Sequence, residues 1–343
     1  VSVRIIIGLL GLVTSLIATG IARVQSSVKS QIAYASISQI GLIFIEISFG
    51  WVNLALIHFA GNAFLRTYQL LVSPSVVSYL IREQFYNFVP RELTLEDSLP
   101  KRLEYSLYIL CINEWNLDSL LYRILWNPLK WVGKQFRFLT LRNTLVFSGI
   151  LFLAGYIVLS FETLLPPEVH RMLPTTFAAT GLFFVLKSFT ERHDVKLSWL
   201  LVLMNHFCIA LSISFNEHFR YEQTMLYLSG VVTFGLGGYV CLYLLKALEK
   251  DIDLDRFHGH AYLYPGLSFA FLICCLSVAG FPITPTFIGE DLIFTHIHTD
   301  QVFLAFFVAL SYIITGLTIL RIYARVFLGP HVKSAYEMAY RSS

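Results

Sequence analysis

The chain has 343 residues, of which 56% are hydrophobic and only 14% are charged. Soluble domains carry about 25% charged residues, so this composition excludes an ordinary soluble protein and indicates a lipid bilayer as its surroundings. The formal net charge of +3 is too small to indicate a nucleic-acid partner, and the sequence has no Lys/Arg-rich run.

Apolar runs long enough to cross a bilayer recur along the chain. A spanning helix needs about 20 mostly apolar residues, and about nine segments qualify: 3–22, 31–49, 51–72, 143–162, 172–190, 196–214, 223–247, 263–285 and 301–327. We therefore predict an all-α, polytopic membrane helix bundle. Its expected parts are membrane helices over 1–83, an interfacial segment over 84–141, and further membrane helices over 142–343.

The second and third predicted spans carry ionisable side chains, which are Lys29, Glu46, His58 and Arg66. Such groups cost about 2.5 kcal/mol or more each at the bilayer centre, and they usually mark an ion or proton path. His58, Asn62 and Arg66 are four residues apart and share one helix face. This face is either part of a proton pathway or a polar contact that fixes helix packing.

These side chains suit different roles. Histidine exchanges protons near neutral pH, whereas Arg66 keeps its proton and supplies a fixed positive charge. Lys29 begins its helix, so it is either an interface anchor that snorkels or a member of the pathway. Glu46 lies near the end of its apolar run, and we expect an interfacial carboxylate there.

Residues 84–141 are charged and aromatic. Apolar side chains recur there at helical spacing, at Leu117, Leu120, Leu121, Ile124 and Leu125. This pattern, followed by Trp and Lys residues, predicts an amphipathic helix in the membrane interface. A surface linker helix docked on the bundle fits the pattern equally well.

Lys196 stands in a weak internal repeat. Asp194-Val195-Lys196 begins a predicted span much as Val28-Lys29 does, and transporters are often built from repeats. Chance similarity between apolar helices gives the same pattern. Lys196 is therefore open to both interpretations, as an interface anchor or as a pathway member.

Residues 276–291 contain two prolines and two glycines within an apolar run that ends at Glu290 and Asp291. Proline and glycine interrupt helices, and broken membrane helices occur where backbone groups line an ion site or water. We predict an interrupted helix with Glu290 on the ion path. The alternative is a proline-containing loop between two spans.

The sequence gives no sign of a cofactor in this chain. Its five cysteines form no Cys-x-x-Cys pair, so we interpret them as packing residues. The two His-x-His pairs, at 258–260 and 296–298, lack zinc-type spacing and are expected to be interfacial, with no metal bound. Any redox chemistry would belong to another subunit.

Three blocks carry a family resemblance: Lys29 with AYASISQIG at 33–41, HFAGNAFLR at 58–66, and LSVAGFPITPTFIGE at 276–290. They resemble blocks of the proton-conducting antiporter-like membrane subunits of respiratory complex I and of multisubunit cation/proton antiporters. Asn62 and Arg66 stand where this family usually has titratable His and Lys. The resemblance leaves out the family's N-terminal half, so we expect a fragment or one piece of a split subunit.

The resemblance implies proton or sodium translocation by one subunit of a larger complex in the inner cell membrane, possessing no redox chemistry of its own. The implied pathway residues are Lys29, His58, Asn62, Arg66, Lys196 and Glu290. One alternative is a structural membrane scaffold that does not conduct, which the replacements at Asn62 and Arg66 favour. Another is a membrane subunit for inorganic carbon uptake with a zinc-protein partner.

Overall fold

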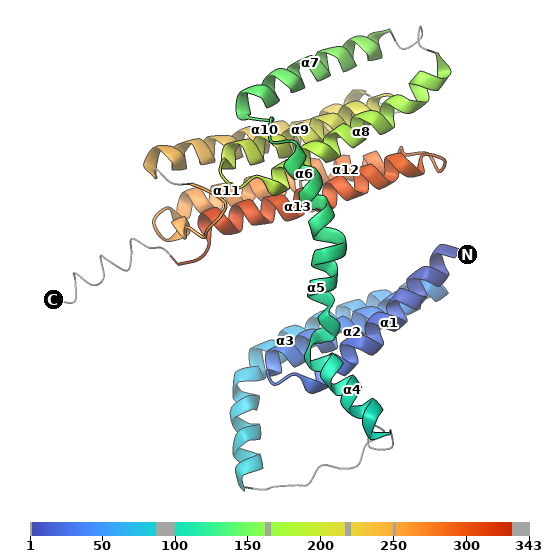
Figure 1. Cartoon of the computed structure of the whole chain (residues 1–343), viewed down its shortest axis with the longest axis vertical. Helices are drawn as coiled ribbons and strands as arrows, with labels where there is room; N and C mark the ends of the chain where they lie inside the picture. The colour runs from blue at the N-terminus through green and yellow to red at the C-terminus, as the bar shows by residue number, and fades with distance from the viewer. Residues whose placement is uncertain (1, 87–99, 162–165, 217–220, 250–251, 331–343) are drawn as a thin grey trace, which may run out of the picture. The chain divides into compact units, whose positions relative to one another are not determined.

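The computed structural model describes residues 2–86, 100–161, 166–216, 221–249 and 252–330 (Figure 1). Every regular element in these ranges is a helix, which confirms the predicted all-α class. The chain forms two compact units, Val1–Ile124 (unit 1) and Leu125–Ser343 (unit 2).

The helices of unit 1 are α1 (Ser2–Val24), α2 (Val28–Phe49), α3 (Val52–Tyr86), α4 (Lys101–Ile112), the short turn η2 (Glu114–Asn116) and α5 (Leu117–Leu121). The boundary between the two units falls within the π-helical turn η3 (Tyr122–Trp126). Unit 2 continues with α6 (Asn127–Gln135), α7 (Leu141–Ser160), α8 (Pro167–Thr190), α9 (Val195–Ser214), α10 (Tyr221–Leu248), η5 (His260–Tyr262), α11 (Pro265–Val278), α12 (Pro285–Thr295) and α13 (Val302–Phe327).

Seven of the described helices are long and apolar enough to cross a membrane: α1, α2, α7, α8, α9, α10 and α13. The chain is therefore a polytopic helical membrane protein, as predicted. Two further expected spans correspond to α3, which carries the polar face with His58, and to α11, which has only 14 residues. α11 is short because the helix is interrupted after Val278.

Close backbone contact holds α1 against α2. A Cβ added to Gly11 would lie 2.6 Å from the carbonyl oxygen of Gly41, and a Cβ on Gly41 would lie 2.6 Å from that of Gly11. Small residues allow membrane helices to approach in this way, because lipid supplies no hydrophobic force between them. Hydroxyl groups join the same two helices, with Thr19 Oγ1 2.7 Å from Ser38 Oγ.

A tight turn brings α3 back along α2. Gly50 adopts a left-handed conformation (φ 83°) at the end of α2, and its N–H donates to the Ile47 carbonyl. The Trp51 N–H donates to the Glu46 carbonyl. Glycine tolerates this conformation, which is a common way to end a helix. The turn fixes which residues of α2 and α3 face each other.

Unit 2 is built around α9, most of whose side chains are buried. Trp199 is fully buried, and its indole N–H donates to the Gly235 carbonyl of α10 at 2.8 Å. Its ring also packs on Phe271 of α11. In contrast, α7 lies at the edge of unit 2 and exposes most of its side chains (Figure 1). This apolar outer surface requires lipid or another subunit to cover it.

The interrupted helix is present. The first half, α11, ends at Val278, and the second half, α12, begins at Pro285 with Thr284 as its N-cap. Between them, Gly280 (φ 68°) and Ile283 (φ 84°) adopt left-handed conformations. Proline at the first helical position supports the restart of the helix.

Part of the predicted interfacial segment over 84–141, residues 87–99, lies outside the described residues. In the described part, Leu120, Leu121 and Ile124 are exposed. Farther along, the helix α6 packs on α8, and Gly133 approaches the Leu186 carbonyl oxygen so closely that an added Cβ would lie 2.4 Å from it. The side chains of Leu120, Leu121 and Ile124 are therefore exposed, whereas α6 is docked on α8.

Candidate functional site

His58 is the centre of a polar contact chain in unit 1. Its Nδ1 lies 2.8 Å from Glu46 Oε1, and its Nε2 lies 2.8 Å from Gln39 Oε1. The turn at Gly50 positions these side chains, because it folds α3 back along α2. Glu46, predicted to be an interfacial carboxylate, pairs with this histidine, and both side chains are largely covered.

The geometry at His58 accommodates two protonation states. The Gln39 oxygen accepts a hydrogen bond, so Nε2 carries a proton. Between Nδ1 and Glu46, a proton can then reside on the imidazole or on the carboxyl group, with the same heavy-atom positions. The second oxygen of Glu46 is buried and has no partner among the described residues. The pair is therefore able to exchange a proton with a neighbouring group or water.

A cavity of about 420 Å³ adjoins this chain. Its lining is Thr19, Ala22, Arg23, Gln31, Ala35, Ser38 and Gln39, from α1 and α2. Gln39 both lines the cavity and contacts His58. Because most of the polar lining groups can bind water, the cavity offers water a route to the Gln39 amide.

Asn62 and Arg66 form a second branch, farther along α3. Asn62 donates to Ser36 Oγ at 3.1 Å and accepts from Arg66 Nε at 3.2 Å. Arg66 also donates from Nη1 to Gln69 Oε1 at 2.6 Å. The structure thus brings His58, Asn62 and Arg66 onto one face, as predicted, although His58 makes its own contacts with α2 rather than with Asn62.

Lys29 is separate from these contacts. It is exposed in the first turn of α2, and among the described residues it has no hydrogen bond or ion pair with the His58 chain. This position suits an interface anchor whose ammonium group reaches the headgroups.

A second polar chain is buried in unit 2, on α9, α10 and α13. The Tyr312 hydroxyl donates to the Tyr227 hydroxyl at 3.1 Å, and the Tyr227 hydroxyl lies 2.7 Å from His206 Nδ1. Since Tyr227 already accepts from Tyr312, its own proton points to Nδ1 and the histidine proton belongs on Nε2. That Nε2 is buried without a partner among the described residues.

Glu290 lies beside this chain. It follows Gly289, whose Cα packs so closely on Tyr227 that an added Cβ would lie 2.5 Å from Tyr227 Cβ. This contact is part of the packing of α12 on α10. The carboxylate also occupies the space beside Gly280, where an added Cβ would lie 2.2 Å from Glu290 Oε2. The helix interruption therefore creates the room that this carboxylate fills.

Lys196 is not part of this chain. Its ammonium group lies 4.5 Å from the ring centroid of Tyr243 on α10. The N-cap Asp194 accepts from the backbone N–H of Lys196 at 3.0 Å. Lys196 is ten residues from His206 on α9, about 15 Å along the helix axis. It therefore occupies the end of α9.

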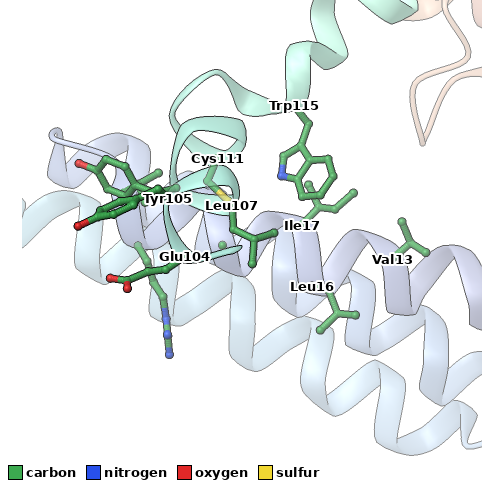
Figure 2. Close-up of a pocket in the computed structure, with 12 residues that line it drawn as sticks. Val13, Leu16, Ile17, Glu104, Tyr105, Leu107, Cys111 and Trp115 are labelled. Atoms are coloured by element: carbon green, nitrogen blue, oxygen red, sulfur yellow. The ribbon is translucent and has the colours of Figure 1, made fainter. Parts of the chain in front are cut away.

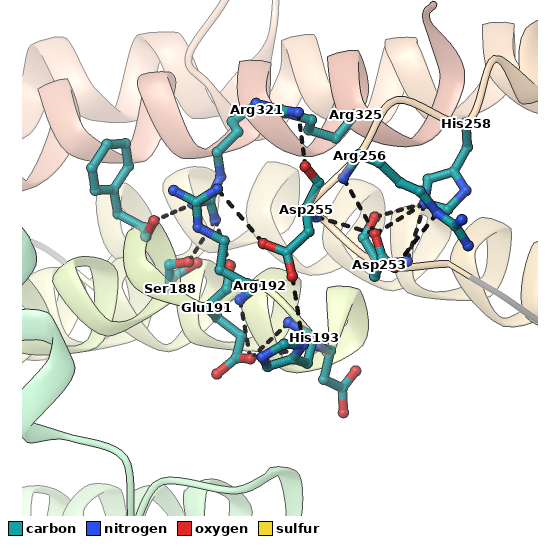
Figure 3. A network of polar contacts seen from close by, with 12 residues as sticks. Ser188, Glu191, Arg192, His193, Asp253, Asp255, Arg256, His258, Arg321 and Arg325 are labelled. Atoms are coloured by element: carbon teal, nitrogen blue, oxygen red, sulfur yellow. Dashed lines mark hydrogen bonds and ion pairs between the residues drawn. The ribbon is translucent and has the colours of Figure 1, made fainter. Parts of the chain in front are cut away.

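The carbonyl end of α8 is held by buried charge (Figure 3). Arg321 of α13 donates to the carbonyl oxygens of Ser188 (2.9 Å), Glu191 (3.0 Å) and Phe189. A cation there offsets the helix dipole and satisfies carbonyls that have no partner inside the helix. Lys187 is 2.5 Å from the Glu191 carboxylate.

Glu191 lies just beyond the membrane-spanning part of α8. Burial raises the pKa of its carboxyl group. The Lys187 hydrogen bond and the backbone N–H groups of His193 and Asp194 lower that pKa, and together they outweigh the effect of burial. The net result is a pKa below the ordinary value of 4.5. Close by, Asp255 pairs with Arg192 at 3.8 Å, so this loop cluster is a network of ionic contacts.

The sequence pattern of a known family matches residues 1–91 and 130–317. That family is described as "NADH:quinone oxidoreductase/Mrp antiporter, TM". The chain belongs to this family. The match includes α2 and α3, and also α9, α10 and the part of α13 up to residue 317, so both polar chains lie on helices of the antiporter-family region.

Two relatives of this antiporter-family chain have different names. It is 33% identical over 98 residues to NADH-ubiquinone oxidoreductase chain 4 of Dictyostelium citrinum, covering 29% of this chain and 23% of that protein. It is 30% identical over 76 residues to the probable inorganic carbon transporter subunit DabB2 of Halothiobacillus neapolitanus, covering 22% of this chain and 14% of that protein. Each alignment spans less than a quarter of the relative.

Sequence reasoning about this antiporter-family chain missed His206, Tyr227 and Tyr312. A signal for His206 was available, because it is an ionisable residue near the middle of the predicted span 196–214, where such residues usually mark function. The tyrosines gave no comparable signal. Tyrosine is common in membrane helices, and only the packing of α10 against α9 and α13 brings these two hydroxyls together.

Proposed function

We propose that this chain is a proton-translocating membrane subunit of a larger complex. The observation that carries the proposal is a pair of polar chains on helices of this bundle, Gln39–His58–Glu46 in unit 1 and His206–Tyr227–Tyr312 beside Glu290 in unit 2. Burying such groups is costly, and a proton path is the commonest reason for that cost. The family membership supports the same function.

In unit 1, the cavity at Gln31 and Gln39 supplies water, and His58 and Glu46 exchange the proton. Arg66 stays charged and acts through its positive field, which disfavours a second positive charge on the same face. In unit 2, Glu290 is the group that takes up and releases protons, and the tyrosine hydroxyls pass them toward His206. Protons rather than sodium suit this chemistry, because the chain of hydroxyl and imidazole groups conducts by proton exchange.

Lys29 and Lys196 are proposed as anchors at the ends of α2 and α9 rather than as relay groups. The apolar outer surfaces of α1 and α7 are proposed to contact lipid and partner subunits in the inner cell membrane. Electron transfer, if it drives transport, is assigned to those partners, and this chain is proposed to need no cofactor.

A second candidate, inorganic carbon transport, is favoured by the likeness to DabB2. The two candidates share the proton path and differ in what is coupled to it. Growth of a carbon-concentrating mutant at low CO₂ after expression of the chain with its neighbouring genes would support the carbon role. NADH-dependent quinone reduction by the purified complex would support the redox role.

A proton-flux measurement tests the proposal. Vesicles that contain the full chain are given a potassium diffusion potential, and an internal pH dye records proton uptake. We expect His58→Gln and Glu290→Gln to lower uptake on the order of tenfold or more. The matched controls His298→Gln and Asp291→Asn, which change exposed side chains, should behave like the parent. Equal uptake by all five proteins would exclude the proposed path.

A further inference from the structure

A second cavity in unit 1 lies between α1 and the α4–η2 segment (Figure 2). Its volume is about 770 Å³, within the usual range for pockets that bind small ligands. Most of its wall is apolar, with Leu16 and Ile17 from α1 facing Leu107 and Cys111 from α4. This cavity and the one at Gln39 share Arg23 in their linings, and the rest of the Gln39 cavity is lined by Thr19 and Ala22 of α1 and by α2.

One end of the cavity is polar and basic. Arg23, in the last turn of α1, lines it together with Glu104, Tyr105 and Tyr108 of α4. Glu104 forms an ion pair with Lys101 at 3.1 Å, so its negative charge is offset. This end therefore attracts an anion. Tyrosine rings beside a cation are typical of the membrane–water interface.

The cavity also contains a hydrogen-bond donor farther from Arg23, toward its apolar end. Trp115 of η2 lies over Ile17 in Figure 2, and its Nε1 is buried without a partner among the described residues. Ile17 is six residues from Arg23 on α1, about 9 Å along the helix axis. Leaving a buried N–H without an acceptor is unfavourable. A bound molecule with a carbonyl group at this depth would supply the acceptor.

We propose that this cavity binds one phospholipid with an anionic headgroup. The phosphate lies at Arg23, an ester carbonyl accepts from Trp115 Nε1, and an acyl chain runs along Leu16 toward Val13. The order of these groups along α1, from charged through polar to apolar, is the order of the parts of a phospholipid. The lipid holds α4 against α1.

Lipid binding by the purified full chain tests this assignment. The chain is stripped of lipid in detergent, and native mass spectrometry follows its titration with phosphatidylglycerol, phosphatidylcholine, dioleoylglycerol or glycerol phosphate. Arg23→Gln removes the proposed phosphate contact, Trp115→Phe removes only the N–H donor, and Leu107→Trp fills the cavity. Arg4→Gln and Leu10→Trp, which alter exposed positions of α1 outside the cavity, are the matched controls.

We expect the parent to hold one phosphatidylglycerol molecule about tenfold more tightly than dioleoylglycerol, with no measurable binding of glycerol phosphate. Arg23→Gln should remove that preference, and Trp115→Phe should weaken both lipids about threefold to tenfold. Leu107→Trp should lose the site, while both controls keep it.

Several results would overturn the assignment. They are unsaturable binding of all lipids, equal binding by Leu107→Trp and the parent, or an unchanged lipid preference in Arg23→Gln. If circular dichroism shows that Leu107→Trp does not fold, the Arg23→Gln and Trp115→Phe titrations decide. These outcomes are independent of proton flux, so they do not depend on the proposed function.

Discussion

His58 Nδ1 on α3 lies 2.8 Å from Glu46 Oε1 on α2. The turn at Gly50 connects these two helices. A histidine and a carboxylate at this distance share a proton, and the second nitrogen of His58 reaches Gln39 beside a cavity. The relationship connects a buried proton-exchanging pair with a place where water can enter. In the proposed function, each partner therefore depends on the other.

We expect the effects of Glu46→Gln and His58→Gln on proton uptake to be strongly non-additive. Each single variant removes one half of the proton-sharing pair, so each should lower uptake by about as much as the double variant. The measurement is dye-detected uptake in vesicles with equal amounts of protein. Multiplicative losses in the double variant would show that the two residues act separately.

Tyr227→Phe should interrupt the chain in unit 2. The ring remains, but Tyr312 loses its acceptor and His206 loses its donor, which we expect to cost about 1–3 kcal/mol of stability as well as most proton uptake. Thermal unfolding and uptake are measured on the same preparations. Tyr243→Phe, on the exposed side of α10, is the control. If Tyr227→Phe retains parental uptake, its hydroxyl is not on the path.

The Glu191 carboxylate should make the stability of unit 2 depend on pH in the acid range. Its folded-state pKa lies below the ordinary value of 4.5. The stabilisation is thus complete above pH 4.5 and is lost as the pH falls below that value through the folded-state pKa. Glu191→Gln should lose about 1 kcal/mol at neutral pH and show a flatter acid profile.

Tryptophan-fluorescence melts between pH 3 and pH 7 measure this dependence, with the exposed Glu222→Gln as a control. A parental acid slope that persists unchanged in Glu191→Gln would assign the pH dependence to other carboxyl groups. The exposed ion pair of His193 with Asp255 contributes little, because solvent screens it.

Membrane topology is expected to follow the positive-inside rule, with the basic segment over 82–140 on the cytoplasmic side. Lys101, at the start of α4, has an exposed side chain and is a suitable labelling site. All five native cysteines are buried, so Lys101→Cys should provide the main signal. An impermeant thiol reagent should label it in inside-out vesicles only. Labelling from outside intact cells would contradict the predicted topology.

The sequence was sufficient for those features that depend on local patterns. Hydropathy located the spans, helical spacing placed His58, Asn62 and Arg66 on one face, and proline and glycine located the break between α11 and α12. Contacts between distant segments were not accessible in this way. The pairing of Glu46 with His58 was not predicted, because it depends on the register set by the Gly50 turn.

The chain of His206, Tyr227 and Tyr312 shows the same limit. These residues come from three helices, and the two tyrosines alone are 85 positions apart. Nothing in their local sequence specifies that their hydroxyl and imidazole groups meet. Arg321 is similar, since its role at the end of α8 depends on the packing of α13. Sequence thus indicates which helices carry polar groups, and packing decides which groups touch.

The central claim is that protons pass through the site at the broken helix, and proton uptake by Glu290 variants tests it most directly. Glu290→Asp keeps a carboxyl group, Glu290→Gln keeps size and hydrogen bonding without charge, and Pro282→Ala changes only the backbone of the break. We predict partial uptake for Glu290→Asp, loss of most uptake for Glu290→Gln, and a smaller loss for Pro282→Ala. Parental uptake by Glu290→Gln, with Pro282→Ala the more harmful change, would contradict the account.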